Sequence, residues 1–361
     1  MSKLTYFGPG PSQLYPEMDS FIADALSQDI CSISHRSKEY IAIHKKTIDE
    51  LRQLISLPDN YHVFFLGSAS ESWERIFNNC VIEKSHHFVN GSFSKKFFSY
   101  GEALNKSVTK TEVPAGEGFD NPKASIPSNT ELITFTHNET STGVSTSLED
   151  IYETRKQFPE ALIAVDVVSS LPYPKIDFNQ IDTAFFSVQK CFGLPAGLGV
   201  WLVNDRCIQK SDKVKKALGT LGSHHSIPEL LGKSTSHQTP STPNVLGIYL
   251  LGRVAEAMNK KTVQILREET DKKAEMLYDF IEKCPYLDYG VKEVKHRSQT
   301  VIVADTTIPA SELNKYLATQ DITIGAGYGK NKTTQIRIAN FPAHSIEIVE
   351  RLIKALDTIQ E

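Results

Sequence analysis

Six short apolar segments, each followed by a polar or glycine-rich turn, constrain the fold of this chain most strongly. They cover residues 61–66, 87–90, 132–136, 161–165, 182–187 and 198–203. Apolar residues with helical spacing occur around them, at residues 16–27, 38–55, 71–80 and 147–157. Short apolar strands that alternate with helices predict an α/β fold with a mostly parallel, doubly wound sheet. We expect the last of these strands to turn back antiparallel.

Candidate site residues follow these predicted strands at their carboxyl ends. They are Ser68 to Ser70, Phe93, Thr140, Asp166 and Lys190. In open α/β sheets, ligands bind outside the carboxyl ends of the strands. The candidates are therefore expected to lie together along one edge of the sheet.

Lys190 comes just after the predicted strand at residues 182–187, and a turn-rich run from Cys191 to Gly197 follows it. By itself such a lysine is more simply interpreted as a solvated side chain. A lysine held in a dry site has a lowered pKa, and its amine attacks carbonyl groups. The working hypothesis is that Lys190 forms a Schiff base with an aldehyde cofactor.

Asp166 and the segment Ser68 to Ser70 would complete a site for pyridoxal 5'-phosphate. Asp166 directly follows a buried apolar strand, where a carboxylate needs a partner such as the pyridine nitrogen. Ser68 to Ser70 lead into a helix, whose free amides and dipole favour a phosphate. A simple strand-to-helix cap would have the same sequence, and the Walker lysine is absent.

The last third of the chain predicts a second, smaller α/β unit. Two long helices, 245–258 and 262–284, lead into the alternating segments that follow. These are strand 299–304, helix 310–318, strand 336–339 and helix 345–359. Arg337 lies between Ile336 and Ile338, so its side chain points away from their face, toward solvent or a cleft.

Composition and charge exclude several classes of function. The 361 residues carry a formal net charge of -4, which gives no sign of a nucleic-acid partner. Apolar runs are much shorter than the roughly 18 residues of a membrane span. The five cysteines have neither metal-ligand nor disulfide spacing. We expect a cytoplasmic protein with no metal, no membrane and no nucleic acid.

Five motifs carry a family resemblance over nearly the whole chain. They are HRSKEY at 35–40, NET at 138–140, DVVSS at 166–170, QK at 189–190 before G-x-P-A-G at 193–197, and TP at 242–243. The set resembles class V (fold type I) aminotransferases, and within them the phosphoserine aminotransferase group. The resemblance implies a seven-stranded, mostly parallel sheet in a large domain at 15–255. A small domain would combine residues 1–14 with 256–361.

The resemblance also implies roles for the cofactor residues. Lys190 would hold pyridoxal phosphate and move a proton, and Asp166 would bind the pyridine nitrogen. Contacts to the rest of the cofactor would come from Ser68, Ala69, Ser70 and Gln189 around the phosphate, Phe93 on the ring and Thr140 near the phenolic oxygen. Ser241 and Thr242 would reach the cofactor phosphate of a neighbouring subunit, which implies a homodimer with shared active sites.

The substrates implied are small amino and oxo acids, bound by His35, Arg36, Lys330 and Arg337. The expected reaction converts 3-phosphohydroxypyruvate and L-glutamate into O-phospho-L-serine and 2-oxoglutarate. Lys330-Asn331 stand where the family has a His-Arg pair that serves the substrate phosphate. The alternative is therefore a class V aminotransferase for an unphosphorylated oxo acid such as pyruvate, glyoxylate or hydroxypyruvate.

Two further classes of protein fit the sequence less well. A cysteine desulfurase needs a mobile nucleophilic cysteine, and Cys207 and Cys284 lie in no evident Gly/Ser-rich loop. Cys191 is adjacent to Lys190, where we expect it to pack. A non-catalytic binding protein with the same fold would lack the absorbance of a cofactor bound to Lys190.

Overall fold

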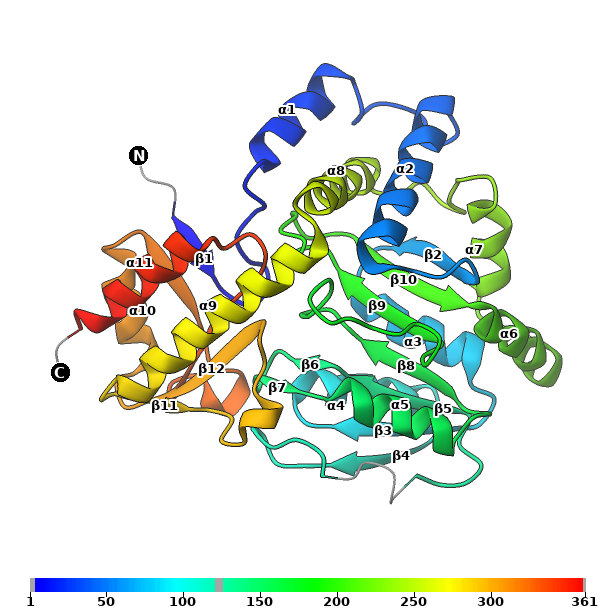
Figure 1. Cartoon of the computed structure of the whole chain (residues 1–361). Coiled ribbons are helices and arrows are strands. Elements are labelled where there is room, and N and C mark those ends of the chain that lie inside the picture. The colour runs from blue at the N-terminus through cyan, green and yellow to red at the C-terminus, as the bar shows by residue number, and fades with distance from the viewer. Residues whose placement is uncertain (1–3, 121–125, 360–361) are drawn as a thin grey trace.

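The computed structural model describes residues 4–120 and 126–359. The predicted domains also include residues 1–3, 121–125 and 360–361, which lie outside the described residues. The larger sheet has seven strands in the order β2-β10-β9-β8-β5-β3-β4 (Figure 1). Their bounds are β2 Tyr61–Leu66, β3 Lys84–Val89, β4 Ser107–Glu112, β5 Leu132–Thr136, β8 Leu162–Asp166, β9 Thr183–Ser187 and β10 Gly199–Asn204.

All neighbouring pairs in this sheet are parallel except those made by β10, which is antiparallel to β2 and to β9. The doubly wound sheet and its reversed strand are therefore confirmed. Parallel strands are buried on both faces, and every residue of β8 and β9 is buried. Phe185 packs into the core on one face of the sheet and Phe186 into the core on the other.

Helices cover both faces of the large sheet (Figure 1). One core contains buried residues of α3 Ala69–Cys80, α4 Ser92–Ala103, α6 Asp205–Leu218 and α7 Ile227–Ser234. The core on the other face contains residues of α1 Met18–Ser27, α2 Lys38–Ile55, α5 Leu148–Gln157 and α8 Val245–Lys261. A two-stranded ribbon, β6 Asn138–Glu139 and β7 Val144–Ser145, follows β5.

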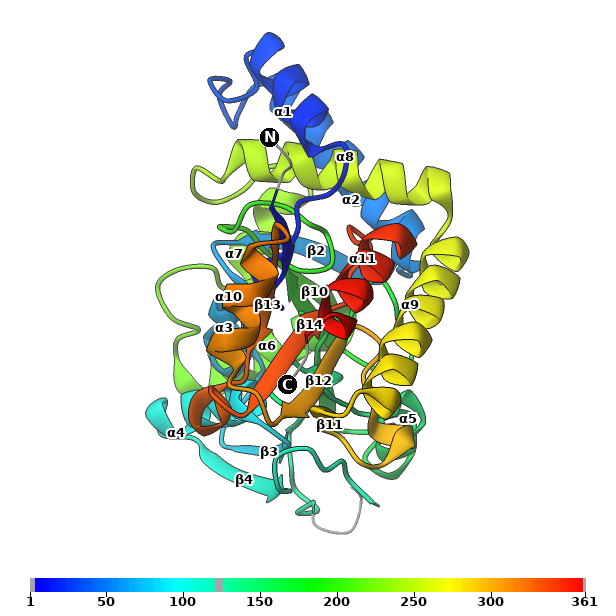
Figure 2. The same ribbon diagram turned by 90° about the vertical axis from the view of Figure 1, so that its left-hand side faces the viewer.

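The second sheet has the order β1-β13-β14-β12-β11, and Figure 2 shows it with α10 and α9 on either side. Its elements are β1 Thr5–Phe7, α9 Val263–Lys283, β11 Leu287–Tyr289, β12 Val301–Thr306, α10 Ala310–Ala318, β13 Ile322–Ala326, β14 Gln335–Ala339 and α11 Ile346–Asp357. β1 pairs in parallel with β13, so the start of the chain joins its last third. Among the described residues, no helix has the length and apolar character needed to cross a membrane.

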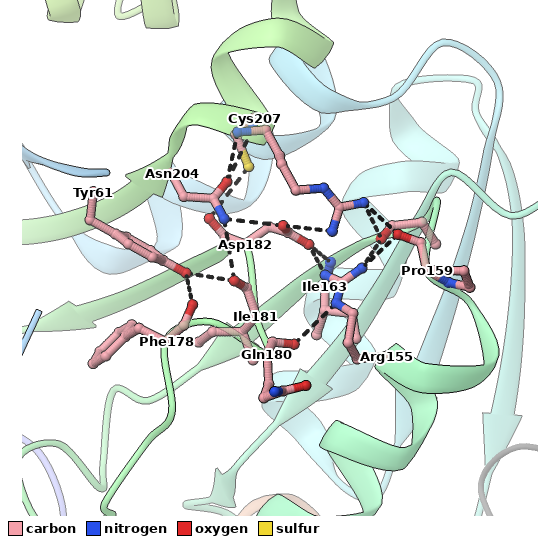
Figure 3. Close-up of polar contacts among 12 residues, drawn as sticks. Tyr61, Arg155, Pro159, Ile163, Phe178, Gln180, Ile181, Asp182, Asn204 and Cys207 are labelled. Carbon is pink, nitrogen blue, oxygen red and sulfur yellow. Dashed lines mark hydrogen bonds and ion pairs between the residues drawn. The ribbon is translucent and has the colours of Figure 1, made fainter. Parts of the chain in front are cut away.

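A buried carboxylate fixes the amino ends of the central strands (Figure 3). Asp182 accepts hydrogen bonds from the Ile163 amide at 2.7 Å and from Asn204 at 3.1 Å. It also forms ion pairs with Arg155 of α5 and Arg206 of α6. Because these partners satisfy both oxygens, the charge is tolerated at 1% exposure. This network holds the end of the sheet opposite to the candidate site.

Candidate active site

Lys190 follows β9 in a tight turn, and its side chain is buried. Its Nζ donates a hydrogen bond to Thr140 Oγ1 at 2.9 Å and lies 5.2 Å from the centre of the Phe93 ring. Burial lowers the pKa of Lys190, and the nearby Asp166 carboxylate only partly opposes that effect. The amine is therefore closer to its neutral, nucleophilic form than a surface lysine.

Asp166 is the last residue of β8, the strand beside β9. Its Oδ1 accepts the Val168 amide at 2.9 Å. Burial raises the pKa of Asp166 to about 7, although the Val168 amide and Lys190 pull it down. A buried carboxyl group needs more hydrogen-bond donors than this amide. The N–H of a protonated ring nitrogen would supply one.

The start of α3 forms a cradle beside these two residues. Ser68 caps the helix by accepting the Glu71 amide at 3.3 Å, so the next amides remain available. Gly199 allows this approach, because a Cβ there would lie 2.3 Å from the Ser68 carbonyl carbon. Trp73 Nε1 and Gln189 Oε1 line the same cavity and have no partner among the described residues. A helix N-terminus with an unused indole N–H suits a phosphate.

Thr140 and Phe93 are fixed by a buried polar network. Thr140 donates to Ser169 Oγ at 2.9 Å, and Asn138 Nδ2 donates to the same oxygen at 2.8 Å. Glu139 accepts the backbone amide of Phe93 at 3.1 Å, which holds the start of α4 against β6. The sequence motif NET therefore has a structural role at Glu139 in addition to the predicted contact from Thr140.

Arg337 enters the site from β14 of the second sheet. Its Nε donates to the Ala326 carbonyl at 2.8 Å and its Nη1 to the Thr140 carbonyl at 3.2 Å. Burial lowers the pKa of Arg337, yet a guanidinium keeps its charge in proteins. The remaining N–H groups can bind a carboxylate.

Tyr328 is a site residue that the sequence analysis missed. Its ring lies 5.4 Å from that of Phe93, and its hydroxyl accepts Lys96 Nζ at 3.0 Å. It therefore bridges α4 and the loop between β13 and β14. The only sequence signal was its position between two glycines, Gly327 and Gly329, in a loop before a strand.

Nine of the predicted site residues line one cavity of about 230 Å³. They are Ser68, Ala69, Ser70, Phe93, Thr140, Asp166, Gln189, Lys190 and Arg337. They come from both sheets, which places the cavity between them. No group of three or more metal-ligating side chains occurs among the described residues.

The other five predicted site residues do not line this cavity. Arg36 donates from Nη1 to the Gln238 side chain and the Thr239 carbonyl, both at 2.8 Å, and His35 is partly buried beside it. Lys330 lines a separate hollow of about 260 Å³. Ser241 and Thr242 line a third, of about 440 Å³. Their predicted roles toward substrate or a neighbouring subunit remain predictions.

This fold and this site define an enzyme that uses pyridoxal phosphate, of fold type I. The lysine, the aspartate and the phosphate cradle are the groups that this cofactor needs, and the indole N–H of Trp73, which has no partner among the described residues, fits its phosphate. The model of the class-V aminotransferase family matches residues 8–339. The chain belongs to the class-V aminotransferases.

Individual relatives agree with this assignment. A phosphoserine aminotransferase of Rhodococcus opacus (strain B4) is 30% identical over 98% of this chain and 94% of that protein. The crystal structure of a phosphoserine aminotransferase from Cytophaga hutchinsonii is 48% identical, covers both chains completely and superposes with a TM-score of 0.98. Alanine–glyoxylate aminotransferase from Nostoc sp., at 20% identity and a TM-score of 0.80, shares the fold.

Proposed function

We propose that this chain transfers an amino group between L-glutamate and 3-phosphohydroxypyruvate, giving O-phospho-L-serine and 2-oxoglutarate. The observation that carries the proposal is the 48% identity to a phosphoserine aminotransferase over the full length of both chains. The cavity adds chemical support, because Lys190, Asp166 and Arg337 lie in it together. We further propose a cytoplasmic homodimer with shared active sites, and the predicted large and small domains.

Pyridoxal phosphate supplies an aldehyde that joins the amino group and a ring that accepts electrons from the substrate Cα. Lys190 would hold the aldehyde carbon and then, with its lowered pKa, take and return the proton of Cα. Asp166 would keep the ring nitrogen protonated. Phe93 would pack on the ring, and Ser68 to Ser70 with Trp73 and Gln189 would bind the phosphate.

Arg337 is proposed to bind the α-carboxylate of each substrate. Its guanidinium is held by the Ala326 and Thr140 carbonyls, so it is oriented before the substrate arrives. For the substrate phosphate we propose Lys330, Arg36 and His35. Arg36 already donates to loop carbonyls, so it would contribute mainly its charge.

A second candidate is transamination of an unphosphorylated oxo acid. It is favoured by the position of Lys330, which lines a different hollow from Lys190. Single-turnover spectra of the holoenzyme with O-phospho-L-serine, L-alanine and L-serine separate the two candidates. We expect phosphoserine to deplete the visible absorbance of the bound cofactor at the lowest concentration. Depletion by alanine alone would reject the phosphoserine proposal.

A further inference from the structure

Glu71, His225 and Ser241 form a hydrogen-bonded series outside the cavity that contains Lys190. Glu71 Oε1 lies 2.6 Å from His225 Nδ1, and His225 Nε2 lies 3.5 Å from Ser241 Oγ. The three residues come from α3, from the loop before α7 and from the loop before α8. His225 is 8% exposed, so its two ring nitrogens depend on these partners.

The Glu71 carboxylate fixes the proton on one ring nitrogen. Burial raises the pKa of Glu71, but the hydrogen bonds from His225 and from the Gly67 amide at 2.9 Å, with the charge of Arg75, bring it below its ordinary value. Glu71 is therefore ionised and can only accept. His225 Nδ1 must carry a hydrogen, because two acceptors cannot approach to 2.6 Å.

The state of the other nitrogen decides where the Ser241 hydroxyl hydrogen points. In a neutral ring, Nε2 has no hydrogen and takes the hydroxyl hydrogen of Ser241. In an imidazolium, Nε2–H donates to Ser241 Oγ, and the hydroxyl hydrogen is free to point away. Only the second arrangement leaves the hydroxyl hydrogen of Ser241 free to bind an anion. Around this ring, Glu71 of α3 bonds to His225, Arg75 of α3 donates to the His224 carbonyl next to it, and the His224 ring stacks on the His225 ring.

The backbone that carries Ser241 is held in place from other directions. Arg36 donates to the Thr239 and Pro240 carbonyls, and Thr239 Oγ1 donates to the Ser241 carbonyl at 2.7 Å. The hydroxyl rotation is therefore the freedom that His225 can control. Ser241 and Thr242 border a hollow of about 440 Å³ that also contains Glu71 and His225.

We propose that Glu71 and His225 are positioning residues that aim the Ser241 hydroxyl hydrogen at an anionic oxygen, the cofactor phosphate of the neighbouring subunit. This inference rests on the shared active sites of the proposed function. Glu71 also belongs to the first turn of the helix whose start forms the chain's own phosphate cradle. The pair therefore connects the cradle of one subunit with the loop that serves the other.

The test is the dissociation constant of pyridoxal phosphate, measured by dialysis of the holoenzyme and by its visible absorbance. His225→Ala should raise this constant about 10-fold, the effect of one lost hydrogen bond to a charged group. His225→Gln places an amide donor where Nε2 lies and should restore most of the affinity. His225→Asn places its amide where Nδ1 lies and should not.

Ser241→Ala supplies the decisive comparison. Because the pair acts through Ser241, adding His225→Ala to Ser241→Ala should change the constant no further. His224→Ala is the matched control. In the part of the chain that the structure describes, the exposed His224 side chain makes no contact that holds Ser241 and stacks on His225, so this variant should bind cofactor as the parent does. Equal losses from His225→Ala with and without Ser241, or equal binding by the Gln and Asn variants, would overturn the inference.

Failure of the proposed function gives a different result. The holoenzyme could show this pattern of cofactor binding and yet not react with phosphoserine. That result would contradict the proposed substrate but support the positioning role of Glu71 and His225. If the holoenzyme reacts with phosphoserine and His225→Ala loses no affinity for pyridoxal phosphate, only the positioning role of Glu71 and His225 is contradicted.

Discussion

At the scale of single residues, burial moves the two central charges of the site toward neutrality. It lowers the pKa of Lys190 and raises that of Asp166 to about 7, while each charge partly stabilises the other. A bound cofactor would relieve both, since it bonds to the amine and offers a ring N–H to the carboxylate. The sequence could identify these residues because each lies at the carboxyl end of a buried strand.

Asp166→Asn should change how the stability of the cofactor-free protein depends on pH. Between about pH 4 and pH 7 the unfolded chain releases the Asp166 proton while the folded protein keeps it. The parent therefore loses stability as the pH rises through this window, and the variant does not. In urea unfolding, the free energy of unfolding of the variant minus that of the parent should increase by about 2–4 kcal/mol between pH 4 and pH 8. Parallel pH profiles would contradict this account of the carboxyl group.

At the scale of elements, the apolar strands were predictable and the polar edge strands were not. β2, β5, β8, β9 and β10 consist mainly of apolar residues, and the prediction placed each within a residue or so. β4 reads SVTKTE and lies at the edge of the sheet, where exposed side chains leave no apolar pattern. β1 and β13 were missed because both segments are short. They become strands by pairing with each other in the second sheet, and that pairing cannot be read from either segment alone.

Gly199→Ala should disturb the cradle through the contact between β10 and α3. The new methyl group would lie 2.3 Å from the Ser68 carbonyl carbon and 2.7 Å from the Ala69 nitrogen, so the helix start must move. We expect cofactor affinity to fall about 10-fold or more and stability by about 1–3 kcal/mol.

Gly232→Ala in α7 is the matched control for that substitution. Among the described residues, no atom apart from the chain neighbours and the backbone of α7 itself lies within 4 Å of the added methyl group. Alanine also favours a helix by up to about 1 kcal/mol over glycine. Its cofactor affinity, measured by absorbance titration, should equal that of the parent. If Gly199→Ala behaved in the same way, the cradle would not depend on this close approach.

At the scale of the whole molecule, the site is formed where the two sheets meet. Arg337 comes from β14 of the second sheet and Tyr328 from the loop before it, while Asp166 ends β8 of the first sheet and Lys190 follows β9. The sequence indicated Arg337 through its place between two isoleucines, but Tyr328 lies in a loop with no periodicity. The pair of Glu71 and His225 was not predictable either, because 154 residues separate them and only the folded chain joins them.

The proposed homodimer with shared active sites predicts that two defective chains can complement each other. Lys190→Ala removes the amine of one site, and the double variant Ser241→Ala with Thr242→Ala weakens the site of its neighbour. In a mixed dimer, one of the two sites would have both the intact lysine and the intact loop. Refolding the two variants together should therefore restore transaminase activity above that of either alone. Activity equal to the mean of the separate variants would show that each chain forms its own complete site.

The most direct test of the account is to identify the lysine that holds the cofactor. Borohydride reduction of the holoenzyme fixes the carbon–nitrogen bond, and peptide mass mapping locates it. Lys273 is the natural competitor, because burial lowers its pKa to about 8, but its Nζ donates to the Phe341 and His344 carbonyls. We predict the added mass on the peptide that contains Lys190 and its loss in Lys190→Ala. Modification of Lys273, or of any other lysine, with Lys190 unmodified would contradict the account.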